Sequence, residues 1–457
     1  TLDDGEQPLL SLCEFLVKTK KKTDLKRTFI AGEKGNVEYM DCMDTEDICH
    51  RDLPAPDYST LMDQPYLSLL PVTNKMHRLW SEGKWNKMTL AHGCYWHRCA
   101  FCDTSLDYIK RYEPSDACTI VDKIEKLIEE TGNRAFHFVD EAAPPALLKK
   151  MAIELIVRNI SISWWTNIRF EKSFTPDLCR LLAKSGCIAI SGGLEVASDR
   201  LLSRIDKGVS VKQVSSVAAA FSSSGIMVHT YLMYGFPGQS EQEIIDALEN
   251  VRQMFEARLI DSAFWHQFAL TAHSPAGLNP DSYGIEITGP AEGSFARNDL
   301  YFNDTVQYDP SDYSQGLRSA LSAFMSGREL KRSVNRWFAF KTPRPTVKRN
   351  FIKTVIKEMR KSLHIHNHSR FIWTGAELRY REGFIELQDT DGAQLIKADK
   401  NMWNFLSELL KICNIKDHRI ITTVQVELLC GKYSIDLDSL LSSELFSVIS
   451  AYGLLII

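Results

Sequence analysis

The amino-acid sequence predicts an α/β fold, a partial barrel of six βα units, over residues 86–285. Short apolar runs alternate there with amphipathic stretches, which is typical of parallel strands joined by helices. Six such repeats fit into about 180 residues, a spacing that favours a barrel over a sandwich. The chain has 457 residues, 44% of them hydrophobic, which is enough for about two to four domains with buried cores.

The βα units can be placed by their start and stop signals. The predicted helix 115–132 begins at Ser115 and Asp116 and ends at Gly132, and Pro145 and Thr175 open two further helices. Two more helices are expected at 211–224 and 241–258. The strands are expected at 88–93, 134–142, 161–170, 187–196, 226–238 and 261–270.

The segments outside the barrel divide the rest of the chain. Residues 1–85 contain a helical pattern at 8–18, a basic run and a linker marked by Pro54 and Pro56. Residues 286–365 are expected to form a helical basic segment, and residues 366–457 a small C-terminal α+β domain. The basic part, 327–361, has two interpretations: a solvated helix face, or a surface for RNA or another anionic ligand with Trp337 and Phe340 available for stacking.

Composition restricts the environment of the chain. The formal net charge of -4 gives no general attraction to nucleic acid or to an anionic membrane. No apolar run reaches membrane-spanning length, and the first residues lack the pattern of a signal peptide, so a cytoplasmic location is expected. Eleven cysteines in such a chain indicate reduced thiols or metal ligands rather than a disulfide framework.

Three cysteines form the strongest motif, in the sequence AHGCYWHRCAFC directly after the first predicted strand. Cys94, Cys99 and Cys102 are soft ligands suited to an iron-sulfur cluster or to zinc. Three thiolates on a four-iron cluster leave one iron open for reactivity. The alternative is a closed zinc site completed by His97 or His92.

The cysteine loop resembles that of the radical S-adenosylmethionine (radical SAM) superfamily. Residues 1–285 are similar to its branch that carries an N-terminal cobalamin-binding domain, through four further segments: DDGEQPLLSL, LPAPDYS, GGLEVASDRLLSRIDKG and YGFPGQSEQE. The spacing departs from the family pattern, because four residues rather than three separate Cys94 from Cys99. On this resemblance, residues 1–85 are the remnant of a doubly wound cobalamin-type domain, and this chain alone is not expected to retain cobalamin.

The resemblance implies a chemistry and a set of cofactors. A [4Fe-4S] cluster would bind S-adenosylmethionine, and an electron would cleave it to methionine and a 5'-deoxyadenosyl radical. Cobalamin-dependent methyl transfer to an unreactive carbon is the leading reaction, with cobalamin-free rearrangement, cyclisation or sulfur insertion as the alternative. The alternative function from outside the superfamily is that of an RNA-binding module whose fold is stabilised by a bound metal. The enzyme would need an external electron donor such as flavodoxin or ferredoxin. No membrane is expected among its partners.

Polar residues at the ends of the predicted strands complete the candidate site, because the carboxyl ends of parallel strands carry ligands. The expected cofactor-binding residues are Asp140, Glu141, Arg169, Glu195, Tyr231, Gly235 and Pro237. Arg169 could bind a carboxylate bidentately, and the turn at Gly235 and Pro237 could pass near adenine. Tyr234 and His266 are candidates for a catalytic role that the sequence does not define.

Overall fold

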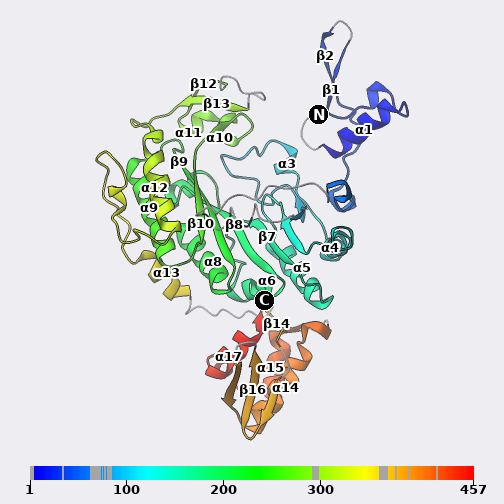
Figure 1. Ribbon diagram of the computed structural model, residues 1–457, viewed down its shortest axis with the longest axis vertical. Coiled ribbons are helices and arrows are strands. Elements are labelled where there is room, and N and C mark those ends of the chain that lie inside the picture. Colours follow the sequence, from blue (N-terminus) through cyan, green and yellow to red (C-terminus); the bar gives the residue numbers. More distant parts are fainter. Residues whose placement is uncertain are drawn as a thin grey trace.

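The core of the protein is a six-stranded sheet, seen in a computed structural model (Figure 1). The structure describes residues 5–32, 35–61, 74, 76, 79, 85–290, 298–359, 369–375, 378–389, 392–417 and 420–457. The spatial order of the strands is β10-β9-β8-β7-β6-β3, and every neighbouring pair is parallel. Their bounds are β3 (Asn86–Met88), β6 (Ala135–Phe138), β7 (Ser163–Ile168), β8 (Cys187–Glu195), β9 (Met227–Tyr234) and β10 (Ser262–Gln267). The predicted partial barrel of six βα units is confirmed.

Helices between successive strands cover the outer face of this sheet (Figure 1). They are α4 (Ala117–Thr131), α5 (Pro145–Val157), α6 (Pro176–Lys184), α7 (Asp199–Arg204), α8 (Val211–Ser223) and α9 (Glu241–Glu256). Their starts follow the sequence signals, since the side chains of Asp116, Thr175, Ser210 and Ser240 each accept a hydrogen bond from a backbone N–H of the first turn. Gly132 ends α4 in the left-handed conformation.

The first predicted strand is interrupted. Residues 88–93 divide between the end of β3 and a two-residue strand, β4 (Ala91–His92), which pairs with β5 (Glu113–Pro114) instead of the main sheet. The buried carboxylate of Asp140 accepts hydrogen bonds from the backbone N–H groups of Leu90 and Ala91, at 2.9 to 3.1 Å, where the chain leaves the sheet. This turn directs the following residues across the carboxyl end of the sheet.

The N-terminal residues form a small unit before the barrel. Helix α1 (Glu6–Leu16) lies close to the helix predicted at 8–18, whereas the hairpin of β1 (Thr28–Ala31) and β2 (Val37–Met40) was not predicted. The short helix α3 (Asp107–Lys110) follows later, after the cysteine loop. The interpretation of residues 1–85 as a domain remnant stays a prediction.

The segment after the barrel differs from the prediction of a helical unit at 286–365. It begins with β12 (Glu286–Pro290) and β13 (Asp299–Asn303), which form an antiparallel sheet with β11 (Leu270–Thr271). Helices α10 (Pro275–Leu278), α11 (Pro280–Tyr283), α12 (Ser314–Met325) and α13 (Phe351–Met359) accompany this sheet. Residues 326–350 contain one short 3-10 turn, at Val334–Arg336, because repeated prolines and few apolar positions do not sustain a helix.

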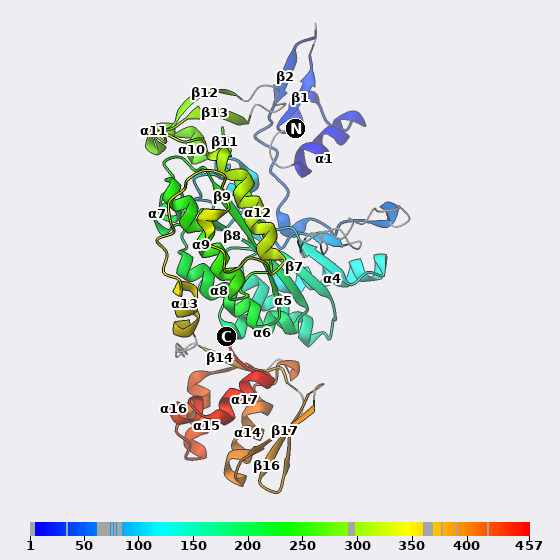
Figure 2. The ribbon, with the colours of Figure 1, turned by 60° about the vertical axis from the view of Figure 1, so that its left-hand side comes forward.

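The C-terminal residues form an α+β unit with a hydrophobic core of its own (Figure 2). Its strands are β14 (Arg370–Trp373), β15 (Arg379–Arg381), β16 (Phe384–Asp389), β17 (Gly392–Lys397), β18 (Ile421–Thr422) and β19 (Leu454–Ile456). Its helices are α14 (Lys400–Ile412), α15 (Thr423–Lys432), α16 (Leu437–Leu441) and α17 (Glu444–Tyr452). Asp177 of α6 accepts a hydrogen bond from the N–H of Ile456 at 2.7 Å, which joins this unit to the barrel.

Among the described residues, no helix has both the length and the apolarity that crossing a membrane requires.

Candidate functional site

The three motif cysteines meet the strand ends in one cavity. Cys94, Cys99 and Cys102 line a cavity of about 310 Å³, together with residues that follow or end β6, β7, β8 and β9. The complete lining is Cys94, His97, Cys99, Cys102, Ile109, Glu141, Ala142, Asn167, Ile168, Arg169, Ser191, Gly192, Gly193, Glu195, Lys207 and Tyr231. The cavity therefore lies at the carboxyl end of the sheet, as the order of strands and loops predicts.

Contacts with distant parts of the chain fix the cysteine loop. The N–H of Cys94 donates to the carbonyl of Ile109 at 2.9 Å, and the N–H of Ala100 donates to the carbonyl of Ile205 at 2.9 Å. Trp96 donates from its indole N–H to the carbonyl of Asp206 at 2.7 Å and packs against Gly208, where a Cβ atom would lie 2.3 Å from the ring. The loop is thus attached to the segment that follows α7.

A local turn accommodates the four residues that separate Cys94 from Cys99. His97 adopts a positive φ of 35°, and its Nδ1 lies 3.0 Å from the carbonyl oxygen of Cys94. The extra residue therefore bulges at an exposed position, and all three thiols still line the cavity.

The electrostatic surroundings stabilise one thiolate. The pKa of the Cys99 thiol is lowered to about 7, chiefly by a hydrogen bond from Cys102 and also by the nearby cations Lys207 and Arg169. The same hydrogen bond, together with burial, raises the pKa of Cys102.

Among the described residues, no three His, Cys, Asp or Glu side chains are close enough to bind one metal ion. A four-iron cluster has a different requirement, since each thiolate binds a different iron.

A buried ion pair forms one wall of the cavity. The ammonium of Lys207 lies 2.7 Å from the carboxylate of Glu195, and the two side chains are only 11% and 10% exposed. Burial opposes the charge of Lys207, but the carboxylate of Glu195 and the thiol of Cys99 outweigh it and raise the pKa of the lysine. Gly193 permits this pairing, because a Cβ atom there would lie 1.7 Å from Glu195 and 2.8 Å from Lys207.

Arg169 and Asn167 both line the cavity, and each has one buried polar atom without a partner within the described part of the chain. Arg169 uses Nε for Glu171 at 2.8 Å and Nη2 for the carbonyl of Lys207 at 2.6 Å, whereas its buried Nη1 has no acceptor. Asn167 donates to the carbonyl of Asp140 at 3.0 Å, whereas its buried Oδ1 has no donor. An unpaired cationic donor and an unpaired acceptor that line one cavity are suited to a ligand with both a carboxylate and an ammonium group.

The structure brings some of the predicted residues together and leaves others outside. Glu141, Arg169, Glu195 and Tyr231 line the cavity with the cysteines. Asp140 does not line the cavity. Its side chain is 1% exposed, and its carboxylate accepts hydrogen bonds from the N–H groups of Leu90 and Ala91. Burial raises the pKa of Asp140 to about 7 against the effect of these donors. Its position indicates support for the chain that leads into the cysteine loop, instead of the expected cosubstrate contact.

Asp140 therefore yields a prediction about folding. In Asp140→Ala, the N–H groups of Leu90 and Ala91 lose a buried acceptor, which costs about 1–3 kcal/mol for an unpaired group. We expect the melting temperature to fall by roughly 5 °C or more, measured by circular dichroism. The neighbouring Glu141→Ala is the control, since Glu141 lines the cavity and should leave the melting temperature unchanged. Equal melting temperatures for wild type and Asp140→Ala would contradict this role.

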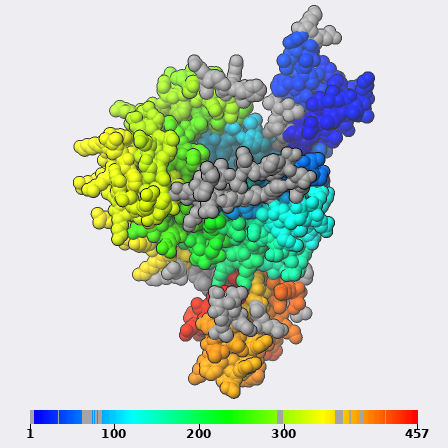
Figure 3. All heavy atoms as spheres, viewed as in Figure 1, coloured from blue at the N-terminus to red at the C-terminus, as the bar shows by residue number. Residues whose placement is uncertain are grey.

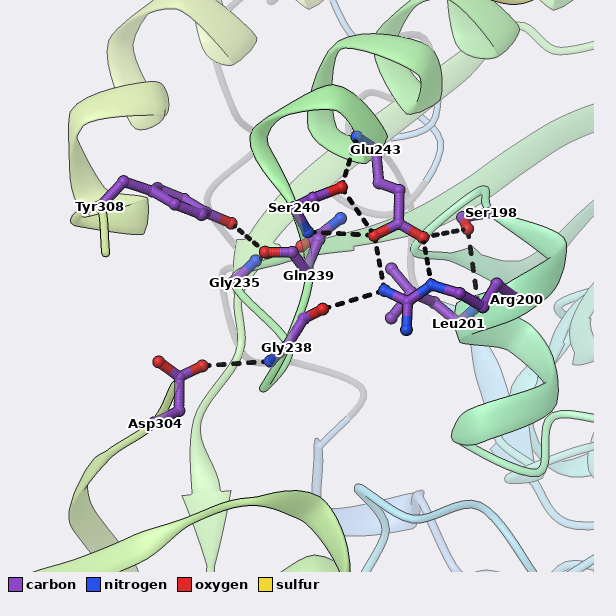
Figure 4. Close-up of polar contacts among 10 residues, drawn as sticks. All are labelled: Ser198, Arg200, Leu201, Gly235, Gly238, Gln239, Ser240, Glu243, Asp304 and Tyr308. Carbon is purple, nitrogen blue, oxygen red and sulfur yellow. Dashed lines mark hydrogen bonds and ion pairs between the residues drawn. The ribbon is translucent and has the colours of Figure 1, made fainter. Parts of the chain in front are cut away.

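The turn after β9 also lies apart from the cavity lining. Figure 4 shows its contacts: the N–H of Gly235 donates to the side chain of Gln239 at 2.6 Å, and the N–H of Gly238 donates to Asp304 at 3.2 Å. Glu243 accepts from Ser198, Arg200 and Ser240 and so joins the start of α9 to the start of α7 (Figure 4). Neither Gly235 nor Pro237 lines the cavity, and these contacts describe a strand-to-helix turn.

The two catalytic candidates are not cavity residues either. Tyr234 is 4% exposed and packs against Trp265 with its ring edge toward the indole, at a centroid distance of 6.3 Å. His266 lies exposed on β10, with its ring 4.5 Å from that of Phe264 and 6.5 Å from that of Tyr231. The structure therefore does not support a role for Tyr234 at the cavity and leaves His266 beside it.

Comparison with known families matches residues 88–251 to the model described as "Radical SAM superfamily". The match contains all three cysteines, the end of β8 with Glu195, and the buried Lys207. Residues 88–251 are therefore similar to a radical SAM domain, the class that the cysteine loop implied.

Individual relatives of this chain are distant. An uncharacterized methyltransferase of Pyrococcus horikoshii is 27% identical over 34% of this chain and 34% of its own length. An anaerobic magnesium-protoporphyrin IX monomethyl ester cyclase of Rubrivivax gelatinosus is 27% identical over 39% of this chain and 32% of its own length. The chain thus spans about a third of the length of these curated relatives.

Among solved structures, the cobalamin-dependent S-adenosylmethionine radical enzyme OxsB with aqua-cobalamin bound is similar in fold. It superposes with a TM-score of 0.52 at 14% sequence identity, over 69% of this chain and 49% of the other. This similarity is one of fold, and it covers about two thirds of this chain.

Several residues that line the cavity were not among the expected cofactor-binding residues: Lys207, Asn167, Ser191 and Gly193. Position was the available signal, since Asn167 near the end of β7 lies two residues before Arg169, which follows that strand. Ser191 and Gly193 share one face of β8, because alternate residues of a strand point the same way. The register shifts between Gly193 and Glu195, so the position of Glu195 does not follow from this alternation.

Proposed function

We propose that this chain is a radical SAM methyltransferase that binds a [4Fe-4S] cluster and S-adenosylmethionine in the cavity at the carboxyl end of the sheet. One observation carries the proposal: three thiols share a cavity with an unpaired arginine donor and an unpaired asparagine acceptor. The thiols suit iron, and the two polar groups suit the amino-acid end of the cosubstrate.

Cys94, Cys99 and Cys102 would hold the cluster. The lowered pKa of Cys99 favours the thiolate form that metal binding requires. When bound, the cluster supplies the electron that cleaves S-adenosylmethionine. The contacts of Trp96 and Ala100 hold the loop that carries the three thiols.

Arg169 and Asn167 would bind the methionine part of S-adenosylmethionine. Nη1 of Arg169 would donate to the carboxylate, and Oδ1 of Asn167 would accept from the ammonium. Glu195 and Lys207 lie on the neighbouring wall, where the carboxylate of Glu195 can accept a hydrogen bond from a hydroxyl group of the ligand. Gly192 and Gly193 allow close approach of a ligand to the β8 backbone, because Cβ atoms there would fill that space.

Methyl transfer with cobalamin is the reaction that the relatives favour. Two of the four curated relatives are named methyltransferases, and the solved enzyme with a similar fold contains cobalamin. On this proposal, residues 1–85 adjoin the cobalamin-binding part of the protein, and a flavodoxin- or ferredoxin-like donor provides electrons. Cobalamin-free cyclisation remains the second candidate, because two other relatives are named cyclases.

An anaerobic assay with a chemical reductant tests the proposal. The reconstituted protein should release 5'-deoxyadenosine or S-adenosylhomocysteine from S-adenosylmethionine, and metabolite pools should gain methyl groups in mass spectra. Because this chain alone is not expected to retain cobalamin tightly, methylcobalamin is added in large excess. It should increase methylation if the first candidate is correct and leave the yield unchanged if the second is. A colourless, zinc-containing protein that releases neither product would contradict both.

Arg169 provides a selective test of the cosubstrate site. In Arg169→Gln the carboxylate of S-adenosylmethionine loses a charged donor, and charge-assisted hydrogen bonds are worth about 1.5–3 kcal/mol. We expect S-adenosylmethionine affinity to fall at least tenfold in isothermal titration, with iron content unchanged. Arg134→Gln is the matched control, since Arg134 is exposed and donates to the carbonyl of Ser161, away from the cavity. Wild-type affinity in Arg169→Gln would place the carboxylate elsewhere.

A further inference from the structure

The segment between α12 and the end of α13 carries an unusual concentration of positive charge. Residues 328–357 contain ten Lys and Arg residues and one acidic residue, Glu329, in a chain whose net charge is -4. We name residues 328–357 the basic strap. All ten of its cationic side chains are exposed. They are Arg328, Lys331, Arg332, Arg336, Lys341, Arg344, Lys348, Arg349, Lys353 and Lys357. The strap lies along one side of the molecule, the yellow side of Figure 3.

Polar side chains of α9 hold the backbone of the strap. Asp246 accepts from the N–H and the hydroxyl of Thr346, both at 2.6 Å. Gln242 donates to the carbonyl of Arg344, and Gln253 donates to the carbonyl of Lys348, each at 2.9 Å. Because these bonds use backbone atoms of the strap, its basic side chains remain available on the outer surface.

The charges of the strap are largely uncompensated. Within the described ranges, Lys353 is the one strap cation with an ion-pair partner, Glu256 at 3.7 Å. Arg332 lies over the ring of Trp337 at 4.2 Å and so keeps its guanidinium at the surface. Ten cations held close together repel one another, and that repulsion is relieved when a polyanion binds.

An exposed aromatic ring lies within this charged surface. Phe340 is 40% exposed, and its ring is supported from below by Tyr313 at 5.1 Å and by Phe338 at 5.8 Å. Lys341 follows directly, so a ring and a cation are presented side by side. Fixed cations with an aromatic platform are the features that bind phosphates and unpaired bases together.

We propose that the basic strap binds single-stranded nucleic acid. The phosphodiester backbone would lie along the strap cations, and an unpaired base would stack on Phe340. This proposal does not depend on the reaction at the cysteine cavity, because no residue of the strap lines that cavity. An acidic protein would use the cations but would have no need of the exposed ring.

The test is a fluorescence anisotropy titration of the full chain with a fluorescein-labelled 20-nucleotide single-stranded RNA of mixed sequence. Parallel titrations use DNA of the same sequence, an RNA duplex and poly-L-glutamate. We expect the single strands to bind more tightly than the duplex, and log Kd to vary linearly with log salt concentration. RNA and DNA titrations show which of the two single strands is preferred.

The variants separate the strap from general surface charge. Lys341→Glu, Arg344→Glu and Lys348→Glu combined should weaken binding at least tenfold and reduce the salt slope by about 2, since each lost phosphate contact accounts for about 0.7. Lys172→Glu, Lys411→Glu and Lys416→Glu combined make the same charge change at exposed sites elsewhere and should have much less effect. Phe340→Ala should weaken binding at least fivefold, and Phe340→Leu, which keeps the apolar packing, should weaken it similarly.

Three results would overturn the proposal. The first is equal loss of binding in the strap and control triple variants. The second is poly-L-glutamate binding as tightly as the single strands, which would indicate an acidic protein partner. The third is full binding by both Phe340 variants at unchanged melting temperature, since the ring would then have no part in recognition.

Discussion

Replacement of any one of Cys94, Cys99 or Cys102 by Ala is expected to abolish the iron-sulfur cluster. Wild-type protein reconstituted under anaerobic conditions should contain about four irons and four sulfides per chain. Each variant should lose most of that iron and its brown colour, because two thiolates cannot anchor the cluster and keep one iron open. Iron and sulfide assays with a visible absorption spectrum provide the measurement.

Cysteines outside the cavity serve as controls. Cys118 is exposed on α4, and Cys413 is buried next to the core of the C-terminal unit, so Cys118→Ala and Cys413→Ala should keep full iron content. Full iron content in all three cavity variants would disprove the assignment of the cluster. Equal loss in the control variants would instead indicate that iron is bound without a defined site.

Local signals explain why the barrel could be predicted from the sequence. Helix starts were marked by residues that do cap helices, such as Asp116 and Thr175, and strands by apolar runs that proved to be buried, as in β8. The hairpin of β1 and β2 was missed because its strands are four residues long and half exposed, which gives no clear alternation. The strands β12 and β13 are similarly exposed and were missed for the same reason.

The site could be predicted as far as strand ends indicate it. Arg169 and Glu195 close β7 and β8 and line the cavity, but Asp140 follows β6 and is turned toward the backbone of Leu90 and Ala91. Gly235 and Pro237 follow β9 but form part of the turn that connects β9 to α9. Lys207 lies beyond α7 and reaches the cavity only because the chain folds back there, and no local pattern gives that contact.

Breaking the buried ion pair of Lys207 and Glu195 is expected to destabilise the barrel strongly. In Lys207→Met, the carboxylate of Glu195 would remain 10% exposed without its cation, and an uncompensated buried charge costs about 3–5 kcal/mol. The free energy of unfolding in urea, followed by tryptophan fluorescence at pH 7, should fall by that amount.

The double variant Lys207→Met with Glu195→Gln distinguishes the ion pair from simple packing. It removes both charges, so the barrel should regain most of the stability that the single variant loses. Affinity for S-adenosylmethionine should stay low in the double variant, because the carboxylate of Glu195 is absent from the cavity wall. If the double variant were as unstable as Lys207→Met, loss of lysine packing rather than an unpaired carboxylate would explain the instability. Separation of the two effects would show that the carboxylate of Glu195 contributes to ligand binding apart from its ion pair with Lys207.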